Sequence, residues 1–305
     1  MEVFYGKKIV PGIAMIRHEI GSRNLLRYAL EGIDEAILKA SLRVKEVIMN
    51  PVINAKLRED EGIINAAGQK AIHADIIAEK VFIKIISELG VSGVLYSEES
   101  GKIEFGDPNS EKQVVILLDP LDGSKNFKNG FPVGCISVAY GEYHPNPKLA
   151  DLTRARIINL YADEEYHAVK GLGAWFNGEP ISENSAGSSI PNLRYYSYAE
   201  DEKKMLKDFD GAIATKSLGS VAWELAMVAS NTRDIFVDTR GKIKAHDFAA
   251  SKLVIEEAGG IFDSFGDSNP NDIILGDFKT GYKVVASRDP VVYHKLSGEM
   301  TNILK

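Results

Sequence analysis

The sequence predicts a mixed α/β protein whose two parts differ in character. Amphipathic helical patterns open the chain, short strands separated by turns follow from Val114 to Ile181, and strands then alternate with helices. Consecutive strands are typical of an antiparallel meander, whereas alternation is typical of an α/β domain. The Ser-, Asn- and Gly-rich stretch Ser182–Asn192 is typical of a linker. We therefore expect an α+β domain with an antiparallel sheet over residues 1–190 and an α/β domain over residues 191–305.

Two helices are predicted before the first strand. Apolar residues recur at helical spacing from Ser22, a candidate N-cap, to Met49, where Asn50-Pro51 ends the pattern. A second helix is expected over Ala74–Leu89, with Gly90 as its stop. Residues 51–70 between them are polar, and we expect irregular structure there.

The remaining elements follow from apolar runs bounded by turn residues. In the first part, strands are expected at Gly93–Leu95, Val114–Leu118, Val133–Tyr140, Arg154–Tyr161, Glu165–Lys170 and Ala174–Phe176. In the second part, strands are expected at Arg194–Tyr198, Gly211–Thr215, Asp234–Val237 and Lys283–Ala286. Helices are expected there at Asp201–Lys207, Ser220–Ser230, His246–Ala258 and from about Asp289.

Composition excludes several classes of function. A net charge of −7 argues against a nucleic-acid surface, which needs clustered Lys and Arg. The single cysteine, Cys135, excludes an internal disulfide and fits a reducing compartment. There is no apolar run long enough for a signal peptide or for a membrane span of about 20 residues. We expect a cytoplasmic protein that binds neither nucleic acid nor a membrane.

The stretch from Leu117 to Phe127 carries the first candidate chemistry. The expected strand delivers Asp119 and Asp122 into a turn that contains Pro120 and Gly123. Two carboxylates crowded at the end of a buried strand repel each other and resist desolvation. Either one of them is protonated or a divalent cation holds both. The backbone N–H groups of such a turn can also hold a phosphate, which suggests metal-assisted phosphoryl chemistry.

Further acidic residues stand at the ends of expected elements. Glu98 and Glu99 follow a strand, Asp247 opens a helix, and Asp75 lies in the first turn of another helix. Oxygen-only ligands with no Cys or His nearby suit a hard cation, and we expect Mg²⁺ before Zn²⁺. The alternative for Asp75 and Asp247 is a carboxylate that stabilises a helix N-terminus. The alternative for Glu98-Glu99 is a solvated loop.

Three motifs in order resemble the inositol monophosphatase and fructose-1,6-bisphosphatase superfamily. They are Glu98-Glu99-Ser100, the Asp-Pro-Leu-Asp-Gly-Ser turn with Asn126-Phe127, and Ala245-His246-Asp247-Phe248-Ala249-Ala250 with Glu257-Ala258-Gly259-Gly260. The resemblance runs from about Leu25 to Ala286. It implies a layered αβαβα sandwich and a Mg²⁺-dependent, lithium-sensitive phosphatase with its site between the two parts.

The resemblance also implies roles for individual residues. The ligands of two Mg²⁺ ions would be Glu98, Asp119, Asp122, Asp247 and the carbonyl of Leu121. Asp75 would help to hold a third, weaker ion, and Glu99 would have an auxiliary metal role. The Ser124 hydroxyl, with Asp75 and Glu98, would orient the attacking water. The amides of Gly123 and Ser124 would hold the phosphate.

Two features need separate interpretation. The third motif of the family usually opens with Trp-Asp, whereas this chain has His246-Asp247; His246 is either a partner of a ligand or a simple substitution. The segment 236–243 resembles prokaryotic members that accept both inositol-1-phosphate and fructose-1,6-bisphosphate. In this segment, Asp238 and Arg240 are candidates for substrate contact. The alternative is that they are exposed charges at the end of an ordinary strand. Gly219 and Ser220 would line the same pocket at a helix start.

The function that the resemblance implies is hydrolysis of a sugar or cyclitol phosphate monoester by direct in-line attack of water, with two or three Mg²⁺ ions. The substrate would be fructose-1,6-bisphosphate, inositol-1-phosphate or both. The alternatives are a phosphatase for 3′-phosphoadenosine 5′-phosphate or NADP, and a non-catalytic regulator that binds a phosphorylated ligand. Family members form dimers and tetramers, so we expect a homodimer or a homotetramer.

Overall fold

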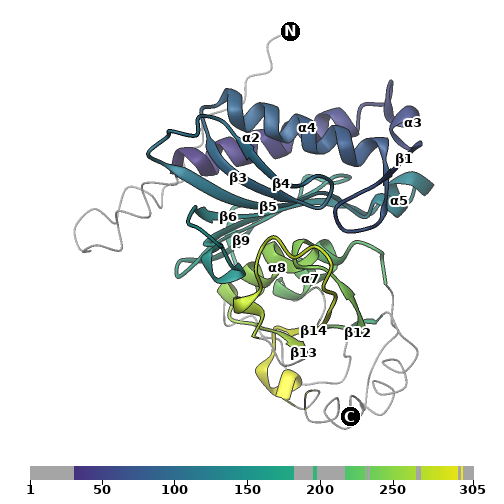
Figure 1. The fold of residues 1–305 in the computed structure, drawn as a ribbon. Helices are drawn as coiled ribbons and strands as arrows, with labels where there is room; N and C mark the ends of the chain where they lie inside the picture. Colours follow the sequence, from purple (N-terminus) through teal and green to yellow (C-terminus); the bar gives the residue numbers. More distant parts are fainter. Residues whose placement is uncertain are drawn as a thin grey trace.

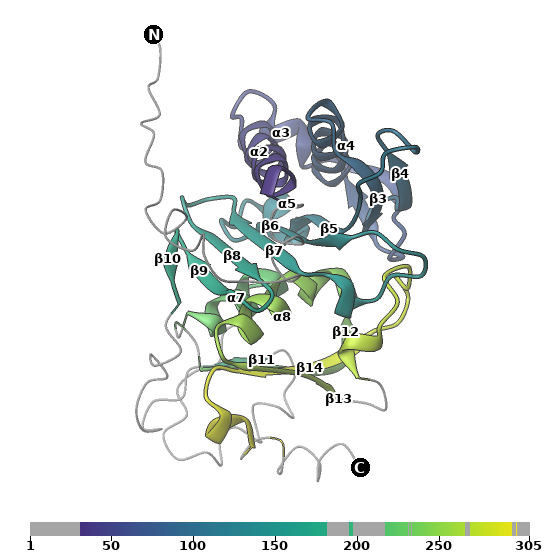
Figure 2. The ribbon, with the colours of Figure 1, turned by 90° about the vertical axis from the view of Figure 1, so that its left-hand side faces the viewer.

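The computed structural model describes residues 31–181, 195–197, 217–230, 232, 234–265, 269–294 and 297. Helices and sheets alternate in layers (Figure 1). Helices α2 (Glu31–Ile48) and α4 (His73–Glu88) cover one face of a large sheet, and α7 (Val221–Ala229) and α8 (Ala245–Glu257) cover the other. A smaller sheet lies beyond α7 and α8, as the edge-on view shows (Figure 2). This arrangement confirms the predicted layered αβαβα fold.

The large sheet has eight strands in the order β10-β9-β8-β7-β6-β5-β3-β4. It is antiparallel throughout except where β3 pairs in parallel with β5. Its strands are β3 (Ser92–Ser97), β4 (Gly101–Phe105), β5 (Gln113–Asp122), β6 (Cys135–Glu142), β7 (Arg154–Asn159), β8 (Glu165–Val169), β9 (Gly173–Phe176) and β10 (Glu179–Pro180). The predicted meander is therefore confirmed.

Strand β5 joins the two hydrophobic cores because its side chains alternate between the faces of the sheet. Val115 and Leu117 belong to the core that contains α7 and α8, whereas Val114, Ile116 and Leu118 belong to the core that contains α2 and α4. A strand that is buried on both faces is apolar throughout, which explains the uninterrupted run in the sequence. The strand thus carries its final residues, Asp119 and Asp122, into the centre of the molecule.

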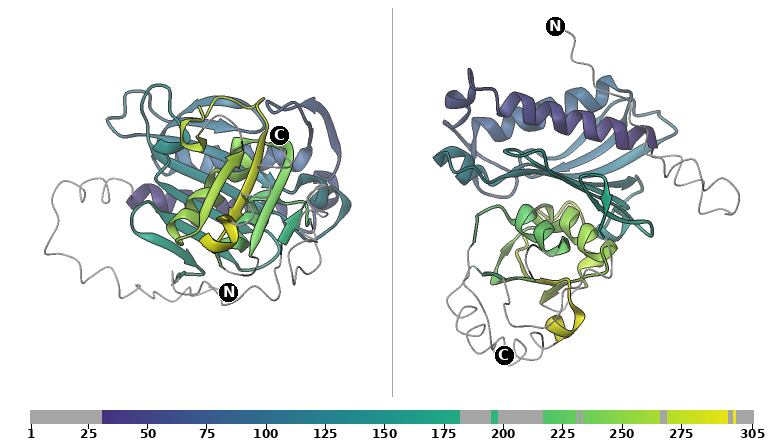
Figure 3. Two further views of the ribbon diagram at one scale, coloured as in Figure 1. Left: turned by 90° about the horizontal axis from the view of Figure 1, so that it is seen from below. Right: turned by 180° about the vertical axis from the view of Figure 1, so that it is seen from behind.

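The smaller sheet has the order β11-β12-β14-β13. Its strands are β11 (Tyr195–Ser197), β12 (Ile235–Ile243), β13 (Ile261–Phe265) and β14 (Tyr282–Ser287). β11 pairs in parallel with β12, and the other two pairings are antiparallel. Seen from behind, α7 and α8 lie between the two sheets (Figure 3). The division into domains at residue 190 stays a prediction.

Several predicted elements change in the structure. The predicted first helix ends at Ile48, one residue before Met49, and its predicted start lies outside the described residues, as do the linker and the elements predicted at 201–207 and 211–215. The prediction of irregular structure over 51–70 was wrong: α3 (Asn54–Leu57) and β1 (Asp60–Ile64) lie there, and β1 pairs with β2 (Lys70–Ile72). The sequence did not predict strand β1, because most of its residues are exposed and it therefore lacks an alternation of apolar and polar residues.

Strands β4 and β13 were also missed, and β12 extends beyond the predicted strand to Ile243. Each has charged or small residues within it, which weakens the apolar signal. Within the described residues, none of the helices combines the length and the apolar character needed to span a membrane.

Candidate active site

Asp119 and Asp122 end strand β5 and are both buried. The Leu121 N–H donates to Asp119 Oδ1 at 3.0 Å, which fixes the turn between the two acids. Gly123 follows with φ of 96°, and a Cβ atom there would lie 2.9 Å from the Val133 carbonyl oxygen, so only glycine fits. The chain then enters α5 (Ser124–Asn129).

The Asp122 carboxylate holds the start of helix α7. It accepts hydrogen bonds from the Ser220 hydroxyl at 2.6 Å and from the N–H groups of Ala222 and Val221 at 2.8 and 3.2 Å. These donors include helix N–H groups that lack a partner within the helix. Burial nevertheless raises the pKa of Asp122 to about 7. Asp122 therefore links the large sheet to the layer of α7 and α8.

Asp75 and Asp247 occupy the same position in two helices, the third residue of α4 and of α8. In each, Oδ2 accepts from the backbone N–H three residues earlier, Ile72 at 2.9 Å and Lys244 at 2.7 Å. The helix-stabilising interpretation is thus correct for one oxygen of each acid. The other oxygen faces the site: Asp75 Oδ1 accepts from the Ser124 hydroxyl at 2.7 Å. Burial raises the pKa of Asp75 to about 6 and that of Asp247 to about 7.

Glu98 and Glu99 follow β3 and share one donor, which the sequence analysis missed. Asn65 Nδ2 lies 3.4 Å from Glu98 Oε1 and 3.2 Å from Glu99 Oε1. Burial, followed by the charge of Asp247, raises the pKa of Glu98 well above its usual range. Burial, followed by Asp75, raises that of Glu99 to about 8. Glu98 is 8% exposed, so the solvated-loop alternative was wrong for this residue.

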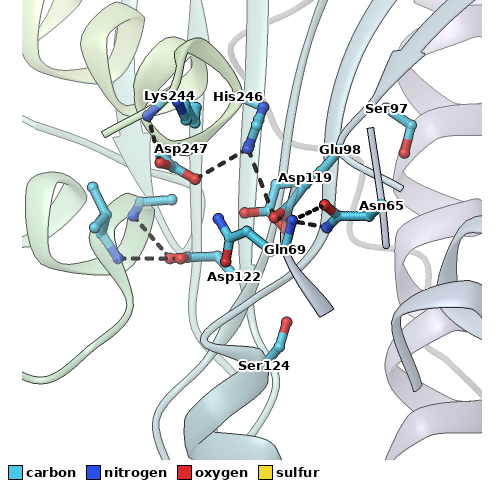
Figure 4. A network of polar contacts seen from close by, with 12 residues as sticks. Asn65, Gln69, Ser97, Glu98, Asp119, Asp122, Ser124, Lys244, His246 and Asp247 are labelled. Atoms are coloured by element: carbon cyan, nitrogen blue, oxygen red, sulfur yellow. Dashed lines mark hydrogen bonds and ion pairs between the residues drawn. The ribbon is translucent and has the colours of Figure 1, made fainter. Parts of the chain in front are cut away.

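In Figure 4, Glu98, Asp119 and Asp122 approach one another from the large sheet and Asp247 approaches them from α8, with His246 above them. Burial raises the pKa of Asp119, and the charges of Glu98, Asp122 and Asp247 raise it further. Within the described residues, no three Asp, Glu, His or Cys side chains already enclose a point that would hold an ion. The site is therefore a group of mutually repelling carboxylates that either keep protons or close on cations.

The segment in β12 approaches the same group. Asp238 is fully buried and pairs with Arg240, whose Nη2 lies 2.5 Å from Oδ2 and whose Nε lies 3.0 Å from Oδ1. The alternative of an exposed strand end was therefore wrong for Asp238. The charge of Asp238 contributes, after burial, to the raised pKa of Asp247.

The loop before α7 is shaped by Glu224, a second residue that the sequence analysis missed. Its Oε1 accepts from the backbone N–H of Gly219 at 2.8 Å, of Leu218 at 2.9 Å and of Ser220 at 3.3 Å. Glu224 stands four residues after the N-cap Ser220, one more than the capping-box spacing, so no motif indicated it.

Comparison with known proteins gives a consistent result. A family model described as the inositol monophosphatase family matches residues 29–298. The fructose-1,6-bisphosphatase/inositol-1-monophosphatase of Methanothermobacter thermautotrophicus is 32% identical over 228 residues, covering 72% of this chain and 81% of that protein. The bifunctional NADP phosphatase/NAD kinase of Methanococcus maripaludis is 30% identical over 275 residues, covering 84% of this chain and 47% of that protein.

A solved structure gives the same fold. It is described as a hypothetical protein from Pyrococcus horikoshii with similarities for inositol-1 monophosphatase, and it matches with a TM-score of 0.65 at 25% identity, covering 90% of this chain and 98% of that one. The family model spans all of the described residues, including the acids of the site. The chain therefore belongs to the inositol monophosphatase family.

Proposed function

We propose that this protein hydrolyses the phosphate monoester of a sugar or cyclitol in a Mg²⁺-dependent reaction, with fructose-1,6-bisphosphate and inositol-1-phosphate as the first candidate substrates. As a member of its family, the chain is a phosphoric monoester hydrolase. One observation carries the proposal: buried carboxylates with raised pKa values gather beside the Asp75–Ser124 hydrogen bond. The fructose-1,6-bisphosphatase/inositol-1-monophosphatase names of two relatives support the substrate class.

Mg²⁺ fits these residues because it prefers carboxylate and carbonyl oxygens. We assign the ligands of two ions to Glu98, Asp119, Asp122, Asp247 and the Leu121 carbonyl, and a third, weaker site to Asp75 and Glu99. The carboxylates would close on the ions by side-chain rotation. Two divalent ions would balance four carboxylates, so that a dianionic phosphate meets no field of like charge. Bound Mg²⁺ would supply the charge that activates water at neutral pH and stabilises the leaving alkoxide.

We assign the orientation of the attacking water to Ser124 and Asp75, next to Glu98. The Ser124 hydroxyl has one proton, which it donates to Asp75 Oδ1 at 2.7 Å or to the Leu121 carbonyl at 2.9 Å, so its lone pairs can accept a hydrogen bond from water. Burial raises the pKa of Asp75 above its usual value, which makes its carboxylate a stronger base on this path than an exposed aspartate. The attack is direct and in line, without a phosphoenzyme.

We assign phosphate binding to the amides of Gly123 and Ser124 at the start of α5. Asp238 and Arg240 are our candidates for contact with the remainder of the substrate. The Arg240 side chain is 34% exposed, so it can reach a ligand while it stays paired with Asp238. The Gly219 N–H and the Ser220 hydroxyl already bond to Glu224 and Asp122, so these two residues would give the pocket its wall rather than its hydrogen bonds.

A nucleotide phosphatase is the second candidate. The bifunctional NADP phosphatase/NAD kinase matches a larger share of this chain, 84%, than the first relative, 72%. The metal chemistry would be the same, and the substrate would be NADP or 3′-phosphoadenosine 5′-phosphate. Only the binding of the group that carries the phosphate would differ.

A phosphate-release assay on the purified full chain tests both candidates. Fructose-1,6-bisphosphate, inositol-1-phosphate, NADP and 3′-phosphoadenosine 5′-phosphate are compared with Mg²⁺, with EDTA, and with Mg²⁺ plus Li⁺. We expect Mg²⁺-dependent release, highest for one of the first two substrates and inhibited by Li⁺. A preference for NADP would select the second candidate, and absence of release from every substrate would contradict the enzyme assignment.

The matched variants are Asp119→Asn and Asp272→Asn. Asp119→Asn should lose at least about 1,000-fold in kcat, since a charge that holds the metal in the transition state is removed. Asp272 has a side chain that is 64% exposed and pairs with Lys148, so Asp272→Asn should keep wild-type turnover. Turnover in Asp119→Asn equal to wild type would overturn the metal assignment.

A further inference from the structure

His246 is a buried polar residue that the proposed reaction leaves without a role. It is the second residue of α8, it is 2% exposed, and its ring lies 6.1 Å from that of Phe278. Within the described residues, neither Nδ1 nor Nε2 has a hydrogen-bond partner. Burying a polar group without a partner costs free energy, and nearly all such groups in proteins are satisfied. The free nitrogens of His246 therefore indicate a missing partner.

The position of Nε2 indicates what that partner is. Nε2 lies 3.4 Å from Asp247 Oδ1 and 3.9 Å from Glu98 Oε1, and Figure 4 shows the ring directed toward the carboxylates. Ligand atoms at about 2.1 Å from a tetrahedral ion stand about 3.4 Å apart, and neighbouring ligands of an octahedral ion at that distance stand about 3.0 Å apart. Nε2 and Asp247 Oδ1 are thus at the spacing of two atoms that share an ion, whereas Glu98 Oε1, at 3.9 Å, would reach the same ion after a side-chain rotation.

The oxygen nearest to Nε2 is also the one that Asp247 has available. Asp247 Oδ2 accepts from the Lys244 N–H at 2.7 Å and caps helix α8, which leaves Oδ1 toward the site. Since α8 carries both residues on its first turn, the cap that orients Asp247 fixes the backbone of His246 as well. The usual tryptophan of the family motif has no atom that binds a cation, so this feature distinguishes the present chain.

We propose that Nε2 of His246 is a ligand of one of the cations in the active site, together with Asp247 Oδ1 and Glu98 Oε1. The inference rests on the proposed function in that the site binds divalent cations. An imidazole ligand favours first-row transition ions such as Mn²⁺, Co²⁺ and Zn²⁺ over Mg²⁺, which strongly prefers oxygen. The site therefore binds these ions more tightly, relative to Mg²⁺, than an all-oxygen site does.

Pulsed EPR of Mn²⁺ bound to the full chain tests the ligand directly. Protein labelled with ¹⁵N in histidine only and loaded with stoichiometric Mn²⁺ should show the coupling of a directly bound ¹⁵N nucleus. His246→Gln, which keeps a polar side chain but has no imidazole, should lose the coupling. His144→Gln should keep it, because His144 is half exposed and pairs with Asp151 away from the acidic residues of the site.

Affinity provides a second measurement. In competition between Mn²⁺ and Mg²⁺, His246→Gln should weaken Mn²⁺ relative to Mg²⁺ by on the order of 10- to 100-fold, the size of effect seen when a group that supports a metal site is removed. His246→Trp, which restores the family residue, should give the same loss. An unchanged ratio in both variants would overturn the inference.

The outcomes separate this inference from the proposed function. If the wild type binds Mn²⁺ and releases phosphate without nitrogen coupling, His246 is not a ligand, and the phosphatase assignment stands. If the wild type neither binds Mn²⁺ nor releases phosphate, both fail. The wild-type spectrum decides the matter even if a variant at His246 does not fold.

Discussion

Two groups of buried carboxylates have pKa values shifted in opposite directions. Asp34 in α2 faces Arg154 and Arg156 in β7 and His167 in β8; Arg154 pairs with it, and Arg156 Nη2 and His167 Nε2 lie at 3.6 Å from Oδ1. Burial alone would raise the pKa of Asp34, but the neighbouring histidine and the guanidinium charges outweigh it and lower the pKa below its usual value. The chain itself supplies the positive charge that this carboxylate needs.

Among the residues that the structure describes, no facing arginine or lysine compensates the acidic residues of the site in this way. Burial raises the pKa of Glu98 and Asp119, and the neighbouring charges that act next most strongly on both are carboxylates, which raise it further. Lys244 lowers the pKa of Asp247, but less than burial raises it, and its ammonium group donates to the Lys279 carbonyl. Burial is common to both groups, so it does not separate a structural carboxylate from a ligand. The balance of charge does: the second group must either keep protons or take up cations, as we propose, whereas the first needs neither.

Removing the charge of Asp34 should give the largest effect on stability. Asp34→Asn removes the carboxylate that pairs with buried Arg154, while Arg156 keeps its pair with Glu165, and breaking a buried ion pair costs about 3 kcal/mol or more. Urea unfolding measures the loss, and phosphate release should remain at the wild-type level because Asp34 belongs to no part of the site. Glu35→Gln is the control, since Glu35 is exposed on the same helix and pairs with exposed Lys39; it should unfold like the wild type. A large loss of kcat in Asp34→Asn would contradict the view that Asp34 serves stability and the acids of the site serve the reaction.

The next largest effect is expected on turnover, when the hydroxyl of Ser124 is removed. Ser124→Ala should lower kcat about 100-fold, equivalent to about 2.7 kcal/mol, because Asp75 loses the hydroxyl through which we expect it to act on water. Ser124→Thr keeps the hydroxyl and should retain most of the activity, and stability should change little in either variant. Steady-state kinetics with Mg²⁺ measures both. Equal kcat values for the alanine and threonine variants would show that the hydroxyl has no part in the reaction.

The sequence predicted those parts of the site that follow from local chemistry. The turn from Asp119 to Ser124 was found because an apolar strand, a proline and a glycine with two acids occur together in a short stretch. Asp75 and Asp247 were found as acids in the first turn of a helix, and one of their oxygens does serve the helix. The resemblance then brought these distant segments into one site.

The other polar residues of the site and core depend on contacts between distant segments, which no local sequence pattern predicts. Asn65 lies after an exposed strand without alternation, and its role appears only when β3 brings Glu98 and Glu99 to it. The Asp34 group joins one helix to two strands far along the chain, and none of its members stands in a motif. Glu224 holds a loop from a position that fits no capping pattern. Side chains that satisfy backbone or charge at a distance are therefore the part of this fold that the sequence alone left unpredicted.

The pH dependence of stability should distinguish the Asp34 group by its sign. A carboxylate with a lowered pKa in the folded state contributes stability above its unfolded pKa of about 3.9, and this contribution is lost as the pH falls through the folded pKa. The difference in unfolding free energy between wild type and Asp34→Asn should therefore be constant from pH 7 to about pH 5 and shrink below about pH 4. Each pKa unit is worth about 1.4 kcal/mol. A difference that grows on acidification would show that the pKa of Asp34 is raised instead.

The smallest expected effect is the change in stability caused by Asp119→Asn. It contrasts the two groups most directly, because its sign is opposite to that expected for Asp34→Asn. In EDTA, Asp119→Asn should stabilise the protein by on the order of 1 kcal/mol, since it removes one of several mutually repelling buried acids, and an amide oxygen can still accept from the Leu121 N–H. Added Mg²⁺ should then stabilise the wild type, by linkage to binding, and stabilise Asp119→Asn much less. Thermal unfolding with EDTA and with Mg²⁺ gives all four values. If Asp119→Asn is destabilised in EDTA, as we expect for Asp34→Asn, then groups within the chain already neutralise the charge of Asp119. That result would contradict the proposal that a cation from solution does so.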